Sequence, residues 1–167
     1  MTFLETDRLI LRNVRREDAA VMFDYRNNPV CARYQRGQIK DLPGIQALVK
    51  EREQDVLSAE SNALIAVELK ATGEMVGEIV VMPNEECFSL GYTFHYAHHR
   101  RGYAYETLSA LTELLHNRYP DWEFISFTEP ENEASMALLK KLGYQDLGYV
   151  PKLTSQMFGK WLKEEKG

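Results

Sequence analysis

The alternation of apolar and polar residues divides the first third of the chain into a strand and two helices. Residues 8–12 are typical of a strand, and residues 16–23 begin a helix that stops before Pro29. Asp41 and Pro43 are start signals for a second helix, in which apolar residues recur at the helical period while charged residues fill the other face. An apolar stripe of this kind indicates that the second helix lies on a sheet.

Three successive strands follow the second helix. Residues 62–69 and 75–82 flank a turn at residues 70–74, which predicts an antiparallel hairpin. A second turn at residues 83–86 leads into a third strand at residues 87–95. The later elements are a helix with Leu108, Leu111 and Leu115 at helical spacing, a strand at residues 123–128, a helix from about residue 132 to residue 142, and a partly apolar tail. We predict one α/β (α+β) domain over residues 1–167, with helices covering a mixed, largely antiparallel sheet.

Composition and charge narrow the class of protein. The chain has 167 residues, of which 44% are hydrophobic and 27% are charged, as in ordinary globular proteins. No apolar run approaches the roughly 18 residues of a membrane span, and residues 1–6 lack the features of a signal peptide, so we expect a cytoplasmic protein without a membrane partner. The net charge of -5 argues against nucleic-acid binding, which needs a broad basic surface. A local basic patch would therefore indicate a small anionic ligand.

Neither the cysteines nor the histidines have the spacing of a metal site. Cys31 and Cys87 stand apart and form no C-x-x-C pair, so we expect two reduced thiols. His95, His98 and His99 give an H-x-x-H-H pattern that matches no common metal site. We expect no metal, and we favour cationic imidazole beside a phosphate as the role of these histidines.

The basic patch is the sequence HHRRGYAYE at residues 98–106, between the third strand of the meander and the helix that follows. A loop in this position exposes unpaired N–H groups at the positive end of the helix dipole, which attracts phosphate. Gly102 would let an anion approach the backbone, Ala104 keeps the next turn small, and Arg100 and Arg101 add charge. In the alternative interpretation, the glycine merely enters the helix and the arginines lie in solvent. These residues alone leave both interpretations open.

Three motifs in order give a more specific interpretation. LGYTF at residues 90–94 is followed by RGYAYE at residues 101–106; NEAS at residues 132–135 precedes LGY at residues 142–144; and the chain opens with LETDRLILR at residues 4–12. Together they resemble the GNAT superfamily of N-acetyltransferases, in particular the RimJ/RimL-like branch, which is named for enzymes that acetylate ribosomal-protein N-termini. A set of ordered motifs is far more specific than any one glycine-rich loop.

The resemblance implies a fold, a co-substrate and a reaction. The fold is the GNAT acyl-CoA N-acyltransferase fold, with a seven-stranded, mostly antiparallel sheet that is splayed at its centre and flanked by four helices. The co-substrate is acetyl-CoA, without a metal. The reaction moves the acetyl group to a primary amine, either a protein N-terminal α-amine or a small-molecule amine, by direct attack on the thioester. Homodimers are common among relatives of this kind.

The resemblance also implies roles for particular residues. The loop wraps the pyrophosphate, the splayed strand polarises the thioester carbonyl, Asn132 contacts the pantetheine arm, and Ser135 donates a proton to the leaving thiolate. The CoA-binding residues that it implies are Tyr92, Thr93, Phe94, His99, Arg100, Arg101, Gly102, Tyr103, Ala104, Tyr105 and Asn132. In the alternative interpretation Asn132 only caps a helix and Ser135 is a residue of its first turn, although the two kinds of role can coexist.

The candidate general base is Glu78, because a carboxylate in the middle of an apolar strand is unusual. The alternatives for Glu78 are an exposed strand edge or a salt bridge, and Glu86 or a water relay could serve as the base instead. Without a strong base the enzyme would favour amines of low pKa. Near pH 7, deprotonating an amine of pKa about 10.4 costs roughly 4.6 kcal/mol, whereas an α-amino group near 7.8 costs about 1 kcal/mol.

Several positions depart from the family pattern. His99 stands where the family most often has Gln or Arg, and Tyr105 stands where it usually has a small residue. Ser89 stands where many members of the branch have glutamate, and Leu139 stands where many relatives have a tyrosine that acts as general acid. Tyr144 is expected to be a packed aromatic without a catalytic role. Ser89 and Leu139 keep a non-catalytic acyl-CoA-binding module open as the competing function, because they stand where the family often has catalytic groups. A nucleotide-phosphate binder fits the cradle but not the later motifs.

Overall fold

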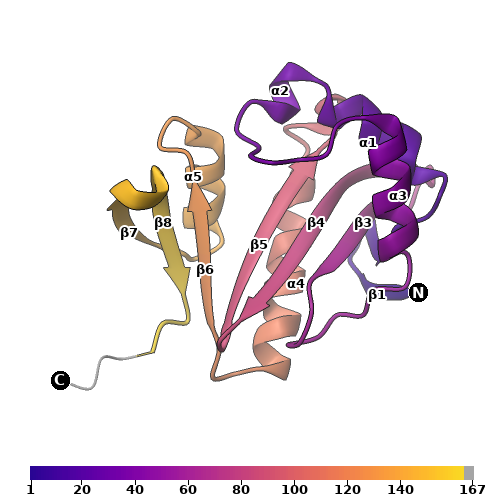
Figure 1. Ribbon diagram of the computed structural model, residues 1–167. Helices are drawn as coiled ribbons and strands as arrows, with labels where there is room; N and C mark the ends of the chain where they lie inside the picture. The colour runs from indigo at the N-terminus through magenta and orange to yellow at the C-terminus, as the bar shows by residue number, and fades with distance from the viewer. Residues whose placement is uncertain (164–167) are drawn as a thin grey trace.

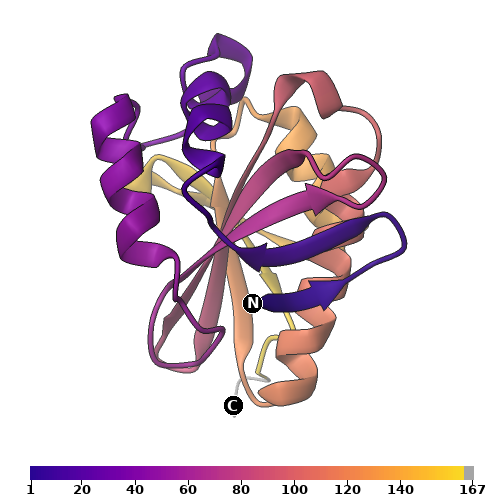
Figure 2. The same ribbon diagram turned by 90° about the vertical axis from the view of Figure 1, so that its right-hand side faces the viewer.

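The computed structural model describes residues 1–163, and the strands in this part of the chain form one sheet (Figures 1 and 2). The eight strands are β1 (Thr2–Glu5), β2 (Leu9–Asn13), β3 (Ala63–Leu69), β4 (Met75–Asn84), β5 (Cys87–Phe94), β6 (Glu123–Thr128), β7 (Gln145–Val150) and β8 (Ser155–Lys160). Their order in the sheet is β1-β2-β3-β4-β5-β6-β8-β7. All neighbouring strands are antiparallel except β5 and β6, which are parallel.

Helices cover both faces of this sheet. The five α-helices in the described residues are α1 (Asp18–Arg26), α2 (Pro29–Ala32), α3 (Leu42–Arg52), α4 (Tyr103–Arg118) and α5 (Glu133–Lys141), with short 3-10 turns at η1 (Tyr96–His98) and η2 (Pro151–Leu153). The helices α1 and α3 lie on one face, whereas α4 and α5 lie on the other (Figures 1 and 2). Two separate apolar clusters result, one under α4 and α5 and one under α1 and α3.

Local capping explains where two of these helices begin. The carboxylate of Asp41 accepts a hydrogen bond from the Gly44 N–H at 2.8 Å, so α3 starts where the sequence predicts. The side chain of Asn132 accepts from the Ser135 N–H at 3.2 Å and caps α5 in the same way. Side chains thus satisfy helix N–H groups that would otherwise have no acceptor.

The sheet divides where β5 meets β6. These strands pair only at their first residues, Cys87 with Glu123 and Phe88 with Phe124. Beyond that point they separate, as Figure 1 shows, and the later part of β5 has strand β4 on one side only. We call this feature the β5–β6 divergence. It gives β5 a free edge in the centre of a continuous sheet, where backbone N–H and C=O groups can bind other partners.

The fold class and the splayed, mostly antiparallel sheet predicted from the sequence are confirmed, but two counts were wrong. The sheet has eight strands rather than seven, because Thr2–Glu5 adds an edge strand to β2. The described residues form five α-helices rather than four, because Asn28 caps the short helix α2 through the Val30 N–H. Neither element has a long hydrophobic period, so the pattern did not reveal it.

Candidate functional site

The loop before α4 has the backbone of an anion-binding helix start. Gly102 is the N-cap of α4 with a φ of 79°, and no side chain caps the helix. Arg100 also has a left-handed backbone, with a φ of 64°. The first N–H groups of α4 therefore lack side-chain acceptors and lie at the positive end of the helix dipole. This arrangement fits a phosphate group.

The side chains of the loop before α4 and of the first turn of α4 divide into exposed and packed groups. Arg100 and Arg101 are exposed beside the loop, whereas Tyr103 is buried in the core under α4. Ala104 and Tyr105 are half-buried, and the ammonium of Lys141 lies 4.2 Å from the centre of the Tyr105 ring. The two arginines can therefore reach a ligand at the loop, while Tyr103 supports the helix from below.

Arg8, in the loop between β1 and β2, contacts the loop before α4, although it was not predicted as a site residue from the sequence. Its guanidinium donates to the Arg101 carbonyl at 2.9 Å and to the Glu106 carboxylate at 2.7 Å. It also lies 4.7 Å from the centre of the Tyr103 ring. Although partial burial opposes ionisation of Glu106, hydrogen bonds from Thr6 and Arg8 lower the pKa of this carboxyl. Arg8 and Arg101 are far apart in the sequence, so only the fold brings Arg8 to the loop before α4.

The histidines beside the loop have separate partners. His99 Nε2 lies 2.7 Å from the Phe94 carbonyl, which can only accept, so this nitrogen donates. His95 Nδ1 accepts from the Ala97 N–H, and its Nε2 lies 2.9 Å from the Asp24 carboxylate. Burial is the main cause that lowers the pKa of His98, which argues against a cationic His98 at neutral pH. Residues 1–163 contain no cluster of His, Cys, Asp or Glu that could hold a metal ion.

The later part of β5 is hydrogen-bonded by side chains from α2 and from the segment between α2 and α3. The Tyr92 carbonyl accepts from Gln35 Nε2 at 3.2 Å, and Thr93 Oγ1 accepts from Gln38 Nε2 at 3.2 Å. The Phe94 carbonyl accepts from the thiol of Cys31 at 3.3 Å. Cys31 of α2 and the segment that follows it, as far as Gln38, therefore lie beside the unpaired part of β5, the strand that the resemblance associates with the thioester.

Tyr92 and Ser135 bring β5 and α5 together. Their hydroxyl oxygens are 2.8 Å apart, and either group can donate. Burial raises the pKa of Tyr92, an effect that the hydrogen bond to Ser135 partly offsets, so the phenol stays protonated at neutral pH. Leu139 and Tyr144 are both packed in the core, as expected of Tyr144 from the sequence, and burial raises the pKa of Tyr144. Tyr92 and Ser135 thus place two hydrogen-bonded hydroxyl groups between β5 and α5.

Glu78 lies on the other face of the sheet, in a buried ion pair. Its side chain is 2% exposed, and that of Arg26 in α1 is 5% exposed. Arg26 donates to both carboxylate oxygens at 2.8 and 2.6 Å, and the Tyr25 hydroxyl donates at 2.6 Å. The salt-bridge alternative is therefore the one that the structure shows. A carboxylate with both oxygens hydrogen-bonded is poorly placed to receive a proton from an amine, so the geometry disfavours Glu78 as a base.

The other candidate base also lies away from the divergence. Glu86 is in the turn between β4 and β5, where Glu85 and Glu86 have φ values of 49° and 61°. Its carboxylate pairs with the exposed Lys163 ammonium at 2.8 Å, and this contact lowers the pKa of Glu86. This turn adjoins the end of β5 that pairs with β6. Ser89, which stands where many members of the branch have glutamate, lies opposite Met82 in the pairing of β4 and β5.

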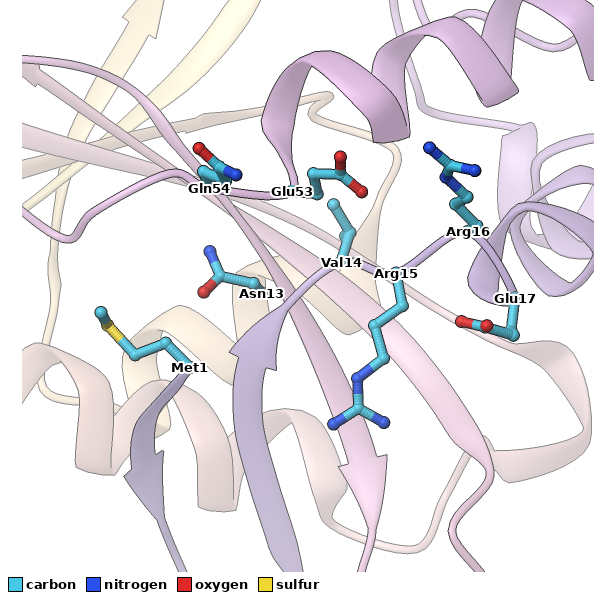
Figure 3. Close-up of a pocket in the computed structure, with 8 residues that line it drawn as sticks. All are labelled: Met1, Asn13, Val14, Arg15, Arg16, Glu17, Glu53 and Gln54. Atoms are coloured by element: carbon cyan, nitrogen blue, oxygen red, sulfur yellow. The ribbon is translucent and has the colours of Figure 1, made fainter.

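Two surface pockets lie outside the β5–β6 divergence. One, of about 330 Å³, lies between the end of β2 and the end of α3, and Figure 3 shows its lining residues Met1, Asn13, Val14, Arg15, Arg16, Glu17, Glu53 and Gln54. The other, of about 560 Å³, lies between α1, the turn before β4 and η1. Neither is lined by Tyr92 or Ser135. None of the helices in the described part of the chain has the length and apolar character of a membrane span.

The predicted site residues therefore form two neighbouring groups and one that stands apart. The loop residues from His99 to Tyr105 meet β5 through the hydrogen bond between His99 and Phe94, and β5 meets α5 through Tyr92 and Ser135. Asn132 caps α5 beside Ser135. Glu78 points to α1 instead. Arg8, Gln35 and Gln38 complete the surroundings. Arg8 lies within the opening motif LETDRLILR, whereas no short motif marks Gln35 or Gln38.

Comparison with known proteins gives this arrangement a family. The uncharacterized N-acetyltransferase YoaA of Bacillus subtilis (strain 168) is 29% identical over 152 residues, which cover 88% of this chain and 85% of YoaA. An acetyltransferase of the GNAT family from Bacillus anthracis superposes with a TM-score of 0.80 at 19% identity, covering 95% of this chain and 96% of that one. RimL, a ribosomal-protein α-N-acetyltransferase solved in complex with coenzyme A, superposes with a TM-score of 0.80 at 13% identity, covering 96% and 97%.

The two structural matches show only that the fold is shared, because their sequence identities are low. The family itself follows from the sequence match: the acetyltransferase (GNAT) domain matches residues 8–145, most of the chain. The GNAT fold binds acetyl-CoA and carries acetyltransferases, which disfavours a non-catalytic module. This chain belongs to the GNAT acetyltransferase family.

Proposed function

We propose that the protein is an acetyl-CoA-dependent N-acetyltransferase of the RimJ/RimL-like branch, whose acceptor is a primary amine of low pKa such as the α-amino group of a protein. The observation that carries this proposal is the pair of hydroxyl groups on Tyr92 and Ser135, 2.8 Å apart, beside the free edge of β5. A thioester supplies an activated acetyl group. The chain must therefore hold the coenzyme, receive a neutral amine and return a proton to sulfur.

The loop before α4 is the proposed pyrophosphate site. The free N–H groups at the start of α4 would bind phosphate oxygens, and Arg8, Arg100 and Arg101 would add positive charge. The backbone of β5 from Tyr92 to Phe94 would face the acetyl-bearing arm, with Asn132 contacting it from the start of α5. These groups belong to different elements, so the phosphate and the thioester ends are held independently.

The proposed reaction is a direct transfer. The amine nitrogen uses its lone pair to form the new C–N bond at the carbonyl carbon, and the C–S bond breaks. Ser135 donates its hydroxyl proton to the leaving sulfur and takes a proton from Tyr92. Tyr92 regains a proton through water, as the acylated nitrogen loses one. No net proton is gained or lost by the protein.

The properties of the candidate bases support an acceptor of low pKa. Glu78 is held by Arg26 and Tyr25, and Glu86 is paired with Lys163 in the distant turn. An amine must then arrive neutral with little help from a carboxylate. Because an α-amino group near 7.8 costs about 1 kcal/mol to deprotonate near pH 7, against roughly 4.6 kcal/mol for a lysine-like amine, the α-amino group is the better acceptor.

The test is an acceptor screen. The protein is incubated with acetyl-CoA and N-terminal peptides, polyamines, amino acids or aminoglycosides, and the products are identified by mass spectrometry while thiol release is followed. We expect acetylation of a primary amine, with a higher kcat/KM for α-amino peptides than for polyamines. Saturable binding of acetyl-CoA without acetylation of any amine would overturn the enzymatic proposal. Comparable kcat/KM for both classes, once pH profiles are matched, would overturn the preference for low pKa.

A further inference from the structure

Gln38, in the segment that contacts β5, has a side-chain oxygen that is buried and unpaired. Three side-chain atoms of this kind occur within residues 1–163: Gln38 Oε1, His98 Nδ1 and His116 Nδ1. His116 stacks on Trp161 with ring centres 3.9 Å apart, and His98 borders the pocket beside α1. Gln38 is the one whose side chain is bonded to β5, through Nε2 and Thr93 Oγ1 at 3.2 Å. Its unpaired oxygen therefore lies near Thr93 of β5, on the face of the sheet that Thr93 shares with its cross-strand partner Glu78.

The position of Gln38 is fixed from both sides of its segment. Arg26 donates to the carbonyl of the next residue, Ile39, at 2.9 Å, and Asn27 donates to the Lys40 carbonyl at 2.8 Å. On the other side, Gln35 is bonded to the Tyr92 carbonyl. Arg26 is itself held by Glu78, so the buried ion pair sets where this backbone lies. The amide of Gln38 is thus pre-organised rather than free to turn toward solvent.

A buried carbonyl oxygen without a donor destabilises the protein by about 1–3 kcal/mol. Such an atom needs an explanation, and a catalytic role in which a ligand supplies the missing donor is one. The carbonyl of an amide can accept a hydrogen bond but cannot donate one, so the ligand group must carry N–H or O–H. At this site, the proposed reaction brings an amine to β5.

We propose that Gln38 binds the acceptor amine, with Oε1 accepting a hydrogen bond from the amine N–H. This inference rests on the proposed function. As the nitrogen forms its bond to the carbonyl carbon it becomes positively charged, and the hydrogen bond to Gln38 becomes charge-assisted and stronger. Gln38 therefore stabilises the charge that develops on nitrogen, in addition to orienting the lone pair.

The proposed hydrogen bond favours a primary amine as the acceptor. After attack, a primary amine carries two hydrogens on nitrogen, so one can leave as a proton while the other remains bonded to Gln38. A secondary amine carries one hydrogen after attack, and losing it breaks the hydrogen bond. Gln38 should therefore discriminate between a primary amine and its N-methyl analogue.

Gln35 offers a matched control. Both glutamines lie in the same segment and donate through Nε2 to β5 at 3.2 Å. Gln38 has the buried unpaired oxygen, whereas Gln35 is not among the residues with such an atom. Q38L and Q35L each remove one contact of the segment with β5, but only Q38L removes the proposed amine acceptor. Q38E keeps an acceptor oxygen at the same place.

The experiment measures steady-state kinetics for the best amine from the acceptor screen and for its N-methyl analogue, with calorimetric binding of acetyl-CoA and thermal unfolding as controls. We expect Q38L to lower kcat/KM for the primary amine by about 10- to 100-fold, with acetyl-CoA affinity unchanged. Q35L should have a clearly smaller effect, and Q38E should recover most of the loss. The preference for the primary over the N-methyl amine should shrink in Q38L.

The outcomes separate this inference from the function on which it rests. If the wild-type protein turns over but Q38L matches Q35L, or if the preference for the primary amine is unchanged in Q38L, the role of Gln38 is wrong and the function stands. If the wild-type protein binds acetyl-CoA but acetylates no amine, the function fails and the role of Gln38 fails with it. Loss of acetyl-CoA binding in Q38L, with normal unfolding, would assign Gln38 to the coenzyme instead.

Discussion

The ion pair of Glu78 and Arg26 is buried almost completely, with side-chain exposures of 2% and 5%. We expect E78Q to lower the free energy of unfolding by about 3–5 kcal/mol, because the Arg26 guanidinium would keep its charge in a buried position without a counter-ion. Urea denaturation followed by circular dichroism measures this change. The loss of unfolding free energy should be the same without acetyl-CoA and with acetyl-CoA at concentrations below the dissociation constant of its complex with the protein.

The double variant R26L/E78L is the control for that prediction. It removes both charges, so it should cost less stability than the sum of R26L and E78L measured separately. If E78Q instead unfolds like the wild-type protein while turnover is lost, Glu78 would be a catalytic base and its ion pair would be of secondary importance.

At the scale of residues, the sequence revealed that Glu78 was unusual but not what it contacts. Its partners, Tyr25 and Arg26, come from α1, and only the packing of that helix on β4 brings them together. Ser135 could be predicted from a short motif, whereas Gln38 lies in an irregular segment without periodicity. Chemistry that is local in sequence could thus be predicted, and chemistry that depends on distant elements could not.

The hydroxyl pair gives a prediction about turnover and pH. We expect S135A to lower kcat by about 10²- to 10⁴-fold and Y92F to have a smaller effect, with acetyl-CoA binding retained in both. The raised pKa of Tyr92 keeps its phenol protonated at higher pH than an ordinary tyrosine. Steady-state measurements should therefore show no alkaline loss of kcat up to about pH 10, where half of an ordinary tyrosine is ionised. Unchanged kcat in S135A would exclude Ser135 as the proton donor.

At the scale of elements, the start of α4 depends on Arg8 from another part of the chain. We expect R8Q to weaken coenzyme A binding about ten-fold while kcat at saturation stays near the wild-type value, because a charged donor beside the loop is lost. Calorimetry at two salt concentrations measures the effect, which should diminish at high salt.

E106Q is the matched control for Arg8. It removes the same ion pair, whose Nε to carboxylate distance is 2.7 Å, but leaves the Arg8 charge available to a phosphate. Coenzyme A affinity in E106Q should equal or exceed that of the wild-type protein. Equal weakening in R8Q and E106Q would mean that the ion pair merely supports the loop.

Elements were predictable from sequence where a cap or a long apolar period marked them. Asp41 and Asn132 signalled the starts of α3 and α5, and the structure has both caps. The edge strand β1 is too short to show a period of its own, and it exists because β2 offers it hydrogen bonds. The place where β5 and β6 part depends on pairing between distant strands, so only the family resemblance indicated it.

At the scale of the whole molecule, the segment between α2 and α3 connects the two halves of the sheet. Arg36 donates to the Leu153 and Thr154 carbonyls at 2.9 and 3.0 Å, and its Nε donates to the Glu129 carboxylate at 2.6 Å. The Tyr34 hydroxyl donates to the Glu131 carbonyl at 3.2 Å. The same segment carries the glutamines that contact β5, so its attachment to the far half should hold them in place.

We therefore expect R36A to act on the segment rather than on the whole fold. The side chain of Arg36 is 52% exposed, so global stability should fall by no more than about 1 kcal/mol. Hydrogen exchange measured by mass spectrometry should rise for residues 33–40, and the KM for the amine should rise several-fold while the affinity for acetyl-CoA stays constant. R36K keeps a charge for Glu129 but cannot present the planar fork of donors that reaches both carbonyls, so it should restore only part of the protection. Unchanged exchange in R36A would mean that the contacts with β5 alone hold the segment, and an equal loss of acetyl-CoA affinity would mean that the segment supports the coenzyme rather than the amine.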